Sequence, residues 1–425
     1  MIIATKLAIV LTAVFLSSFL EGQENKNSAE FAKIYSFIQH QNYFKARDEY
    51  AANKEVLSAP FQLLTEVILD NAFNRCAYSQ KKITELLKDG SIIADSLKLK
   101  MLKIKTDNAI KLFQYKDAKN TIAIILAQFK SALKREEIAD FENSFKIWSA
   151  LENVAPQQVT ITKNTVLKMT KDTAGLKNLK VSANSEPINF IFDTGANLCT
   201  TTQSAANRFN MKLFKTEIEV NSITGNSVKA HLAVCKKLTV GNITIENVIF
   251  LVMADKELAF EQIKYQINGI LGFPVIAALN EVKITRDGDF IVSKNAAIFN
   301  GNSNIAMEEL TPIVDIQGAP YTFDTGADHT TLYHAFYLKH QEEINKLYKP
   351  QKIKYGGAGG VVESDGFLVT HTFDIAGQKV ALDSIHLLKE KTKPDEKVFG
   401  NIGQDVIQQF ESMILNFKYM YLKFE

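Results

Sequence analysis

Asp193-Thr194-Gly195-Ala196 and Asp324-Thr325-Gly326-Ala327 are the two stretches around which this 425-residue chain is organised. Each follows a short apolar, β-prone run, Phe190-Ile191-Phe192 in one case and Tyr321-Thr322-Phe323 in the other. The pattern predicts a strand that ends in a carboxylate, followed by a tight turn that a small residue and a glycine allow. One Asp-Thr-Gly is expected by chance in about one chain of this length in ten, so the repetition is what carries information.

The two stretches belong to a longer internal repeat. The number of residues between Asp193 and Asp324, called the repeat interval below, also separates Gly225 from Gly356. The same interval separates Gly269-Ile270-Leu271-Gly272 from Gly400-Asn401-Ile402-Gly403. Three separated landmarks therefore share one register, which indicates an internal duplication of roughly 130 residues.

Paired Asp-Thr-Gly turns, each followed by a glycine-bearing hairpin and a Gly-x-apolar-Gly sequence, resemble the aspartic proteases of the pepsin and retropepsin superfamily. The resemblance covers about residues 160–425. The stretch from Asp324 to Leu332 and the glycine-rich 356–360 are most similar to retropepsins, whereas a single chain carrying both halves is similar to pepsins. Asn401 departs from the family pattern, which has an apolar residue at that place. The resemblance implies an all-β, bilobed, pepsin-like domain.

The resemblance also implies a function, that of an aspartic endopeptidase that needs no metal or organic cofactor. Asp193 and Asp324 would form one catalytic pair that activates a water for peptide-bond hydrolysis. Two carboxylates this close cannot both ionise, so they share a proton and titrate as a unit. The family braces the two turns through the motif threonines and donates glycine amides to the carboxylates. The supporting residues are thus Thr194, Gly195, Thr325 and Gly326.

The tips of the two hairpins are candidate flaps over an extended polypeptide substrate. The stretch 356–360 has four glycines in five positions, which lets main chain approach a peptide closely, and Tyr355 precedes it. Pepsins carry a flap tyrosine in the first half instead, so either flap could dominate. Asp328 matches the retropepsin position that contacts substrate backbone, and Asn197 is its first-half counterpart. The flap and substrate-binding candidates are Thr224, Gly225, Tyr355, Gly356, Gly357, Gly359, Gly360, Asn197 and Asp328.

The residue after each motif glycine predicts a pH range. Pepsins usually have Ser or Thr there, whereas this chain has Ala196 and Ala327. Without a hydroxyl donor the protonated carboxyl is less disfavoured. We therefore expect activity to extend to weakly acidic or neutral pH.

Composition and the absence of other motifs exclude several function classes. Apolar residues make up 46% and charged residues 23%, which is typical of a globular protein. The net charge is +2 and only five of the 49 basic residues are arginine, so nothing indicates nucleic-acid binding. No Gly-Lys-Ser/Thr phosphate loop, His-Glu-x-x-His zinc motif or Gly-x-Ser-x-Gly nucleophile motif is present.

Residues 1–22 have the pattern of a signal peptide. Lys6 precedes an uncharged, mostly apolar run from Leu7 to Leu20, which is short for a membrane span. We expect export to the periplasm or the outside of the cell, with no integral span after the signal is removed. An uncleaved anchor is the alternative.

Residues 23–155 are expected to be helical, because apolar residues recur there at three- and four-residue spacing and prolines are nearly absent. Tyr43–Arg47 resembles Tyr115–Lys119, which follows at about twice the tetratricopeptide (TPR) period. We predict a TPR-like stack of helix pairs, or else a plain helical bundle, offering a surface for a protein partner. Residues 157–163 are expected to be a linker. The first lobe would then occupy residues 160–297 and the second 298–425.

Two questions stay open at the level of sequence. Cys199 and Cys235 could form a disulfide within the first lobe or remain buried thiols. The function could also be that of a catalytically silent peptide-binding protein that recruits a partner through its helices.

Overall fold

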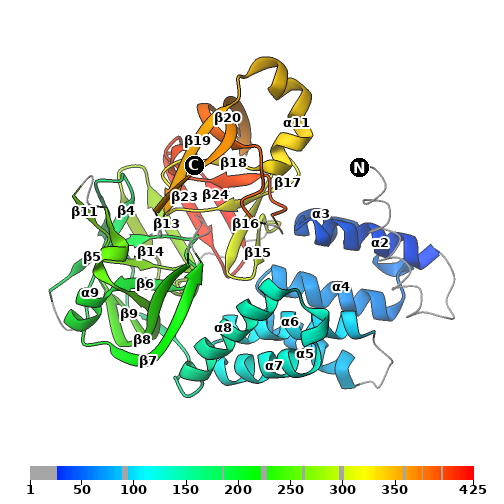
Figure 1. Cartoon of the computed structure of the whole chain (residues 1–425), viewed down its shortest axis with the longest axis horizontal. Coiled ribbons are helices and arrows are strands. Elements are labelled where there is room, and N and C mark those ends of the chain that lie inside the picture. Colours follow the sequence, from blue (N-terminus) through cyan, green and yellow to red (C-terminus); the bar gives the residue numbers. More distant parts are fainter. Residues whose placement is uncertain are drawn as a thin grey trace. The chain divides into compact units, whose positions relative to one another are not determined.

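The computed structural model describes residues 26–88, 94–183, 186–221, 227–260, 264–295, 301–357, 360–375, 377–393 and 396–425. The predicted signal peptide lies outside these ranges. The chain divides into two compact units, Met1–Glu152 and Asn153–Glu425. The first is helical and the second is rich in β-strands (Figure 1). The predicted order of a helical domain followed by a β domain is therefore confirmed.

The helical unit consists of helices joined in pairs by short turns. They are α2 (Lys26–Gln39), α3 (Tyr43–Asn53), α4 (Ala59–Ala72), α5 (Cys76–Lys88), α6 (Asp95–Lys111), α7 (Tyr115–Gln128) and α8 (Arg135–Leu151). Of the helices that the structure describes, none is both long and apolar enough to cross a membrane.

The same turn occurs in three successive helix pairs, α2/α3, α4/α5 and α6/α7. One residue of each turn has a left-handed backbone with φ of 57°, 57° and 58°; these are Gln41, Asn74 and Phe113. The next amide in each turn donates to a carbonyl five residues back, as in a Schellman helix end, at 2.9, 2.7 and 2.8 Å. One turn into each second helix a small residue is fully buried; these are Ala46, Ser79 and Ala118. The helical unit thus repeats one hairpin design, while the comparison with tetratricopeptide repeats stays a prediction.

The β-rich unit contains two large sheets with the same strand order. The first lobe has β3 (Thr170–Lys171), β4 (Lys177–Val181), β5 (Ile188–Phe192), β12 (Gly269–Leu271), β6 (Cys199–Thr202), β9 (Ile243–Met253), β8 (Ser227–Val240) and β7 (Lys212–Asn221). The second lobe has β15 (Ile305–Glu308), β16 (Thr311–Ile316), β17 (Ala319–Phe323), β22 (Gly400–Ile402), β18 (Thr331–Leu332), β21 (Gln378–Leu388), β20 (Gly360–Ile375) and β19 (Gln351–Gly357). Strand for strand, the second sheet repeats the first.

The repeat interval holds at the centre of each lobe but not at the hairpins. Strand β17 begins and ends one repeat interval after β5, and β22 begins and ends one repeat interval after β12. Helix α9 (Gln203–Arg208) has 6 residues and its counterpart α11 (His334–Leu347) has 14. Because of the longer helix, the start of β19 follows the start of β7 by more than the repeat interval. The second hairpin is therefore offset from the repeat interval, and shorter segments after the helix restore the register before β22. Gly225 lies outside the described residues, so its equivalence with Gly356 stays a prediction.

A third sheet is built from both halves of the duplication. Its strands are β2 (Thr165–Lys168), β14 (Asp289–Val292), β13 (Glu281–Thr285), β23 (Ser412–Asn416) and β24 (Tyr421–Phe424), in that order. The central pair is antiparallel, with Lys283 opposite Ile414, its own counterpart in the repeat. An antiparallel pair centred on equivalent residues is what a local two-fold axis requires, so this sheet joins the two lobes symmetrically.

The predicted linker 157–163 is wrong for most of its length. Residues Gln158–Ile161 form β1, which pairs antiparallel with β9. Nearby, Gln157 Nε2 donates to the carbonyl of Pro274 at 2.9 Å. The β-branched Val159, Thr160 and Ile161 suit this edge position. The chain thus enters the β-rich unit directly after α8.

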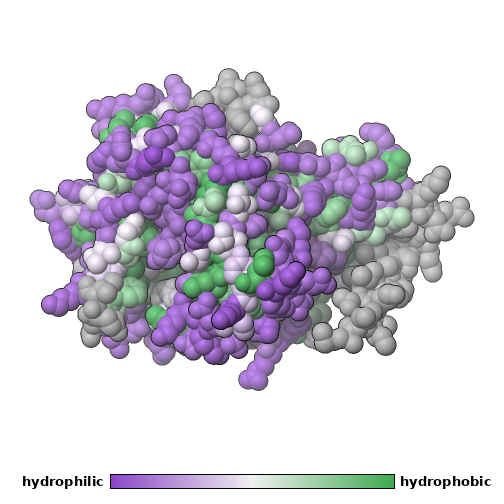
Figure 2. Space-filling view, turned by 90° about the horizontal axis from the view of Figure 1, so that it is seen from above, coloured by the Kyte–Doolittle hydropathy of each residue, from purple (hydrophilic) through white to green (hydrophobic). Residues whose placement is uncertain are grey.

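Apolar side chains fill the interior of each lobe. Phe190 and Phe250 are fully buried in the first lobe, as are Phe323 and Phe373 in the second. On the face drawn in Figure 2, hydrophilic residues cover most of the described surface, and hydrophobic ones form smaller patches between them.

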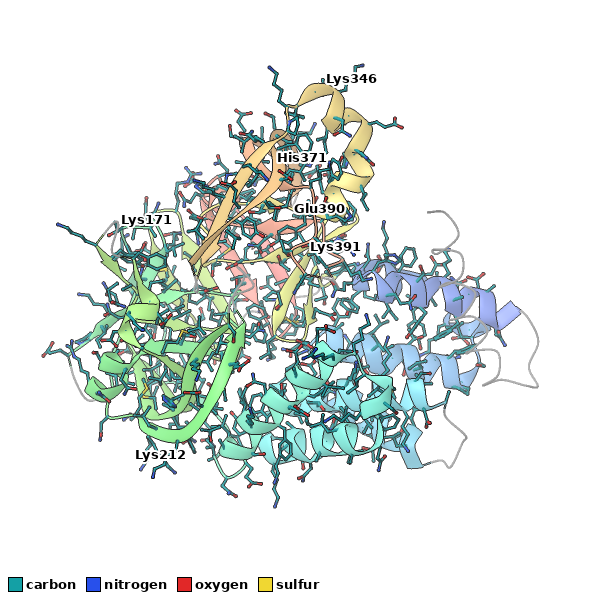
Figure 3. The ribbon with its side chains drawn as sticks, viewed as in Figure 1. Lys171, Lys212, Lys346, His371, Glu390 and Lys391 are labelled. Atoms are coloured by element: carbon teal, nitrogen blue, oxygen red, sulfur yellow. The ribbon has the colours of Figure 1, made fainter. Side chains whose placement is uncertain are left out.

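Helix α11 packs on the second lobe's sheet. The ring of Phe336 lies edge-on to His371 of β20, with centroids 5.0 Å apart. Lys346, near the end of this helix, extends away from the sheet (Figure 3). The additional length of α11 thus extends the outer side of the lobe.

Candidate active site

The two motif aspartates stand at equivalent points of the two lobes. Asp193 follows β5 and its amide donates to the carbonyl of Leu271 at 3.1 Å. Asp324 follows β17 and its amide donates to the carbonyl of Ile402 at 3.0 Å. Parallel pairing of β5 with β12, and of β17 with β22, creates these contacts. Each carboxylate is thus carried by a buried strand pair rather than by a surface loop.

The two turns face each other at close range. A methyl group added to Gly195 would lie 2.6 Å from the carboxyl carbon of Asp324, and one added to Gly326 would lie 2.2 Å from that of Asp193. Each motif glycine therefore packs directly against the carboxylate of the opposite lobe. The structure brings Asp193 and Asp324 together, as the duplication predicts.

The motif threonines lock the two turns together. The Thr325 amide donates to the Thr194 hydroxyl and the Thr194 amide to the Thr325 hydroxyl, both at 3.0 Å. Each hydroxyl in turn donates at 2.8 Å to a main-chain carbonyl of the other lobe, Phe323 for Thr194 and Phe192 for Thr325. Both threonine side chains are buried. The predicted reciprocal brace is present.

The surroundings of the pair favour a shared proton. Burial raises the pKa of Asp193 well above its ordinary value, and the charge of Asp324 and a hydrogen bond to it act in the same direction. The amides of Gly195 and Ala196 donate to Asp193 Oδ1 at 2.8 and 3.1 Å and oppose this increase. On the other side the Gly326 amide donates to Asp324 Oδ1 at 2.8 Å. Burial and the neighbouring carboxylate therefore favour retention of one proton at Asp193 and Asp324 taken as a pair.

Asn401 is a site residue whose role the sequence did not reveal. Its Nδ2 lies 3.3 Å from Asp324 Oδ2, and its Oδ1 accepts from the Thr322 hydroxyl at 2.6 Å. The available signal was a polar residue at a place where the family pattern is apolar. Its counterpart in the first lobe, Ile270, has no polar side-chain atom. Among the residues that the structure describes, the pair therefore has a side-chain amide on the Asp324 side only.

Helices beneath the turns support both aspartates. Helix α10 (Phe273–Ala278) follows Gly272, and α12 (Gln404–Ile407) follows Gly403. The Gly272 amide lies 3.3 Å from Cys199 Sγ, whereas the Gly403 amide donates to the Thr330 hydroxyl at 3.1 Å. Cys199 is thus the first-lobe equivalent of Thr330 and serves as an acceptor under the turn.

The alternative of a Cys199–Cys235 disulfide is ruled out by the strand order. Both thiols are free and buried, and β9 lies between their strands β6 and β8. Strands two places apart are about 9.6 Å from each other, beyond the span of a disulfide. Burial raises the pKa of the Cys199 thiol to about 12 and that of Cys235 to about 11. Neither thiol is set up as a nucleophile.

The flap candidates belong to two long antiparallel hairpins, β7/β8 and β19/β20. Tyr355 is half-buried in β19, opposite Val362, and the adjacent Gly356 and Gly357 lie opposite Val361 and Gly360. Burial and the charge of Glu396 raise the pKa of Tyr355. Thr224, Gly225 and Gly359 lie outside the described residues. The second hairpin thus places its tyrosine in a strand rather than at the tip.

The two candidates for contacts with substrate backbone differ in their partners. Asn197 is exposed, and its Oδ1 accepts from the hydroxyl of Thr311, a residue of the opposite lobe, at 3.3 Å. Asp328 is also exposed, with its Oδ2 3.6 Å from Nε2 of His329. Asp328 therefore remains accessible to a ligand, whereas Asn197 makes a contact between the lobes.

Two further groups were not identified from the sequence: Tyr333, which interacts with Asp324, and Glu396, which interacts with Tyr333. Burial raises the pKa of the Tyr333 phenol, and the charges of Asp324 and Glu396 add to this effect. Glu396 is only 4% exposed; its Oε2 accepts from the Thr392 amide and hydroxyl at 3.0 and 2.6 Å.

Among the residues that the structure describes, no three His, Cys, Asp or Glu side chains are grouped to hold a metal ion.

The comparison with protein families agrees with this geometry. Residues 179–275 match the family model described as aspartyl protease. The match starts in β4 and ends in α10, so it contains Asp193 and its whole support in the first lobe. It supports an aspartyl protease of the pepsin and retropepsin type. No curated protein matches the chain.

Proposed function

We propose that the chain is an aspartic endopeptidase that hydrolyses peptide bonds with a water held between Asp193 and Asp324. The observation that carries the proposal is the close approach of each carboxylate to the motif glycine of the other lobe. Two carboxyl groups in this arrangement form a pair that can act as base and acid in one step.

The proposed reaction keeps its protons within the pair. The ionised carboxylate accepts a proton from the water as the water oxygen bonds to the peptide carbonyl carbon. The protonated carboxyl donates its proton to the carbonyl oxygen, which gives a neutral tetrahedral diol. In the second step the protonated carboxyl donates its proton to the peptide nitrogen, and the ionised carboxylate accepts a proton from one hydroxyl of the diol. The carbon–nitrogen bond breaks, which releases an amine and a carboxylic acid and leaves one proton on the pair.

The aspartyl protease match implies a polypeptide substrate. We propose that the flap hairpins hold it in an extended form, because exposed strand edges offer main-chain donors and acceptors. The half-buried Tyr355 lies in β19, which is the edge strand of its sheet.

The parts outside the β-rich unit receive separate roles. We propose that residues 1–22 direct export, with cleavage after them. The helical unit, with its repeated hairpins, is proposed to bind a protein partner. Mass analysis of the protein recovered from its native compartment tests the first proposal, since an intact Met1 there would contradict it.

Cleavage of a denatured protein over a pH series tests the enzymatic proposal. Purified chain should cleave it, and Asp193→Ala and Asp324→Ala variants with unchanged circular dichroism should not. Pepstatin inhibition of wild-type cleavage would add support. Substrate binding without cleavage by the wild type would favour a silent binding protein instead.

A further inference from the structure

The two lobes differ at one pair of positions next to the aspartates. In the first lobe Ile270 of β12 pairs with Ile191 of β5, and both side chains are apolar. In the second lobe the equivalent pair is Asn401 of β22 with Thr322 of β17. Thr322 lies one repeat interval after Ile191, and Asn401 lies one repeat interval after Ile270. A polar pair has therefore replaced an apolar pair on one side of the site only.

The orientation of Asn401 is set by its neighbours. The residue is 8% exposed, so its amide depends on protein partners. Its Oδ1 lies 2.6 Å from the Thr322 hydroxyl, a shorter contact than the 3.2 Å from that hydroxyl to the carbonyl of Gly400. With the amide oxygen occupied, the NH₂ group faces Asp324 Oδ2 at 3.3 Å. A carboxylate oxygen facing an NH₂ group is best accommodated when it is ionised.

We infer that Asn401 is a positioning residue that fixes the negative charge of the catalytic pair on Asp324 and so leaves the shared proton on Asp193. This inference rests on the proposed function, because it assigns the two roles within that reaction. Asp324 then accepts the proton from water, and Asp193 donates to the carbonyl oxygen of the substrate.

The surroundings of Asp193 agree with this assignment. In the first lobe the position equivalent to Asn401 is occupied by Ile270, whose side chain has no hydrogen-bond donor. Burial, the charge of Asp324 and a hydrogen bond to Asp324 all raise the pKa of Asp193. Ala196 stands where pepsins carry a hydroxyl residue, and the donors to this carboxyl within the described part of the chain are the main-chain amides of Gly195 and Ala196. Ile270 does not offer the first lobe the side-chain amide that Asn401 gives the second.

Two other titratable groups affect the Asp324 side. The Tyr333 phenol interacts with Asp324 and has a raised pKa, so it stays neutral over the pH range of activity. The charge of Glu396 raises the pKa of Tyr333 and of Tyr355.

The test is the pH dependence of kcat/KM in Asn401→Leu, with Ile270→Leu as the matched control in the first lobe. Loss of a donor to the ionised carboxylate should move the acidic limb upward by about one pH unit, with the alkaline limb unchanged. Ile270→Leu should leave both limbs in place. A fall of the alkaline limb in Asn401→Leu would show that the amide oxygen accepts from a protonated Asp324, which would overturn the inference.

A further variant moves the side-chain amide donor from the Asp324 side of the pair to the Asp193 side. Thr322→Ile with Asn401→Ile gives the second lobe the apolar pair, and Ile191→Thr with Ile270→Asn gives the first lobe the polar pair. Combining all four changes should return the acidic limb to within about 0.3 pH units of wild type, because one amide again faces one carboxylate. A limb that stays displaced in a folded four-fold variant would contradict the inference.

A second readout does not depend on activity. Carbon-13 NMR titration of aspartate-labelled protein reports the two carboxyl groups directly, with resonances assigned from Asp193→Asn and Asp324→Asn. In wild type the Asp324 signal should have the ionised shift at the pH where the pair holds one proton, and in Asn401→Leu this preference should weaken. An Asp193 signal that is the ionised one would refute the inference. Absence of cleavage by wild type, with this titration as expected, would refute the proposed function alone.

Discussion

The amide of Thr325 donates to the hydroxyl of Thr194 across the two lobes, and the Thr194 amide returns the same bond, both at 3.0 Å. Each hydroxyl also donates to a carbonyl of the opposite lobe. Four hydrogen bonds among buried groups therefore hold together two turns that lie far apart in the chain. The geometry of the aspartate pair depends on this link.

Replacing one of these hydroxyls should destabilise the β-rich unit. In Thr194→Val the shape is kept, but the Thr325 amide and the Phe323 carbonyl lose their buried partner. The expected loss in free energy of unfolding is about 3 kcal/mol, because unsatisfied buried groups cost more than the net value of a bond. Urea unfolding measures it, and Thr194→Ser, which keeps the hydroxyl, should lose about 1 kcal/mol. Equal stability of the Val variant and wild type would refute the role of the brace.

Adding a methyl group to Gly195 should remove activity without unfolding the protein. The added carbon would lie 2.6 Å from the carboxyl carbon of Asp324, so the carboxylate must move. Displacement of a catalytic group by about 1 Å costs on the order of 100-fold in rate. Gly195→Ala should therefore lose at least that factor in kcat, while its thermal unfolding midpoint stays within a few degrees of wild type. Wild-type turnover in this variant would show that the two turns are farther apart.

Removing the carboxyl of Asp193 should stabilise the fold at higher pH. Its pKa is raised in the folded state, so folding binds a proton and the stabilisation is complete below the unfolded value near 4. Stability is then lost as the pH rises from that value through the folded pKa. Asp193→Asn cannot ionise, and its unfolding midpoint should exceed that of wild type increasingly between about pH 4 and pH 8. A constant difference across this range would contradict the raised pKa.

Cys199 should be inert as a thiol but sensitive to its shape. Burial raises its pKa to about 12, so alkylation at pH 8 should modify Cys199 only after unfolding, as mass spectrometry can show. Cys199 Sγ lies 3.3 Å from the Gly272 amide, and in the second lobe the Thr330 hydroxyl accepts from the equivalent amide of Gly403. Cys199→Thr should therefore retain activity, because a threonine hydroxyl can accept the same bond. Cys199→Val, which has no acceptor, should lose about 1 kcal/mol of stability relative to Thr. Rapid modification of native Cys199 would refute this environment.

Sequence alone was sufficient for the pair itself. Asp193 and Asp324 are fixed by a local pattern, an apolar strand before a tight turn, and the repeat interval made them equivalent. The reciprocal bonds of Thr194 and Thr325 followed from the family resemblance. These features could be predicted because each half of the site is encoded in one short motif, and the duplication and the family resemblance relate the two halves.

Features that depend on pairing between distant strands could not be predicted. Asn401 reaches Asp324 only because β22 pairs in parallel with β17, although β18, α11 and the β19/β20 hairpin lie between them in the chain. Likewise β1 looked like a linker, since its partner β9 comes only after most of the first lobe. The offset of the second hairpin came from the length of α11, which periodicity does not fix. Single-sequence patterns contain no information on such pairings.

The pH expectation drawn from Ala196 and Ala327 changes with the structure. Ala196 and Ala327 both lack a hydroxyl donor, but Asn401 supplies a side-chain donor to Asp324. Of the two aspartates, Asp193 is the one without such a donor among the described residues. We therefore still expect activity to extend to weakly acidic or neutral pH, with the lack of a side-chain donor to Asp193 as its cause.

The most direct test of the central claim compares Asp193→Asn, Asp324→Asn and the double variant in kcat/KM. If the two carboxyl groups act as one unit across the lobes, each single change removes on the order of 10⁴-fold and the double variant is no slower than the slower single. Losses that multiply in the double variant, or turnover that survives either single change, would show that the two groups do not share one water and one proton.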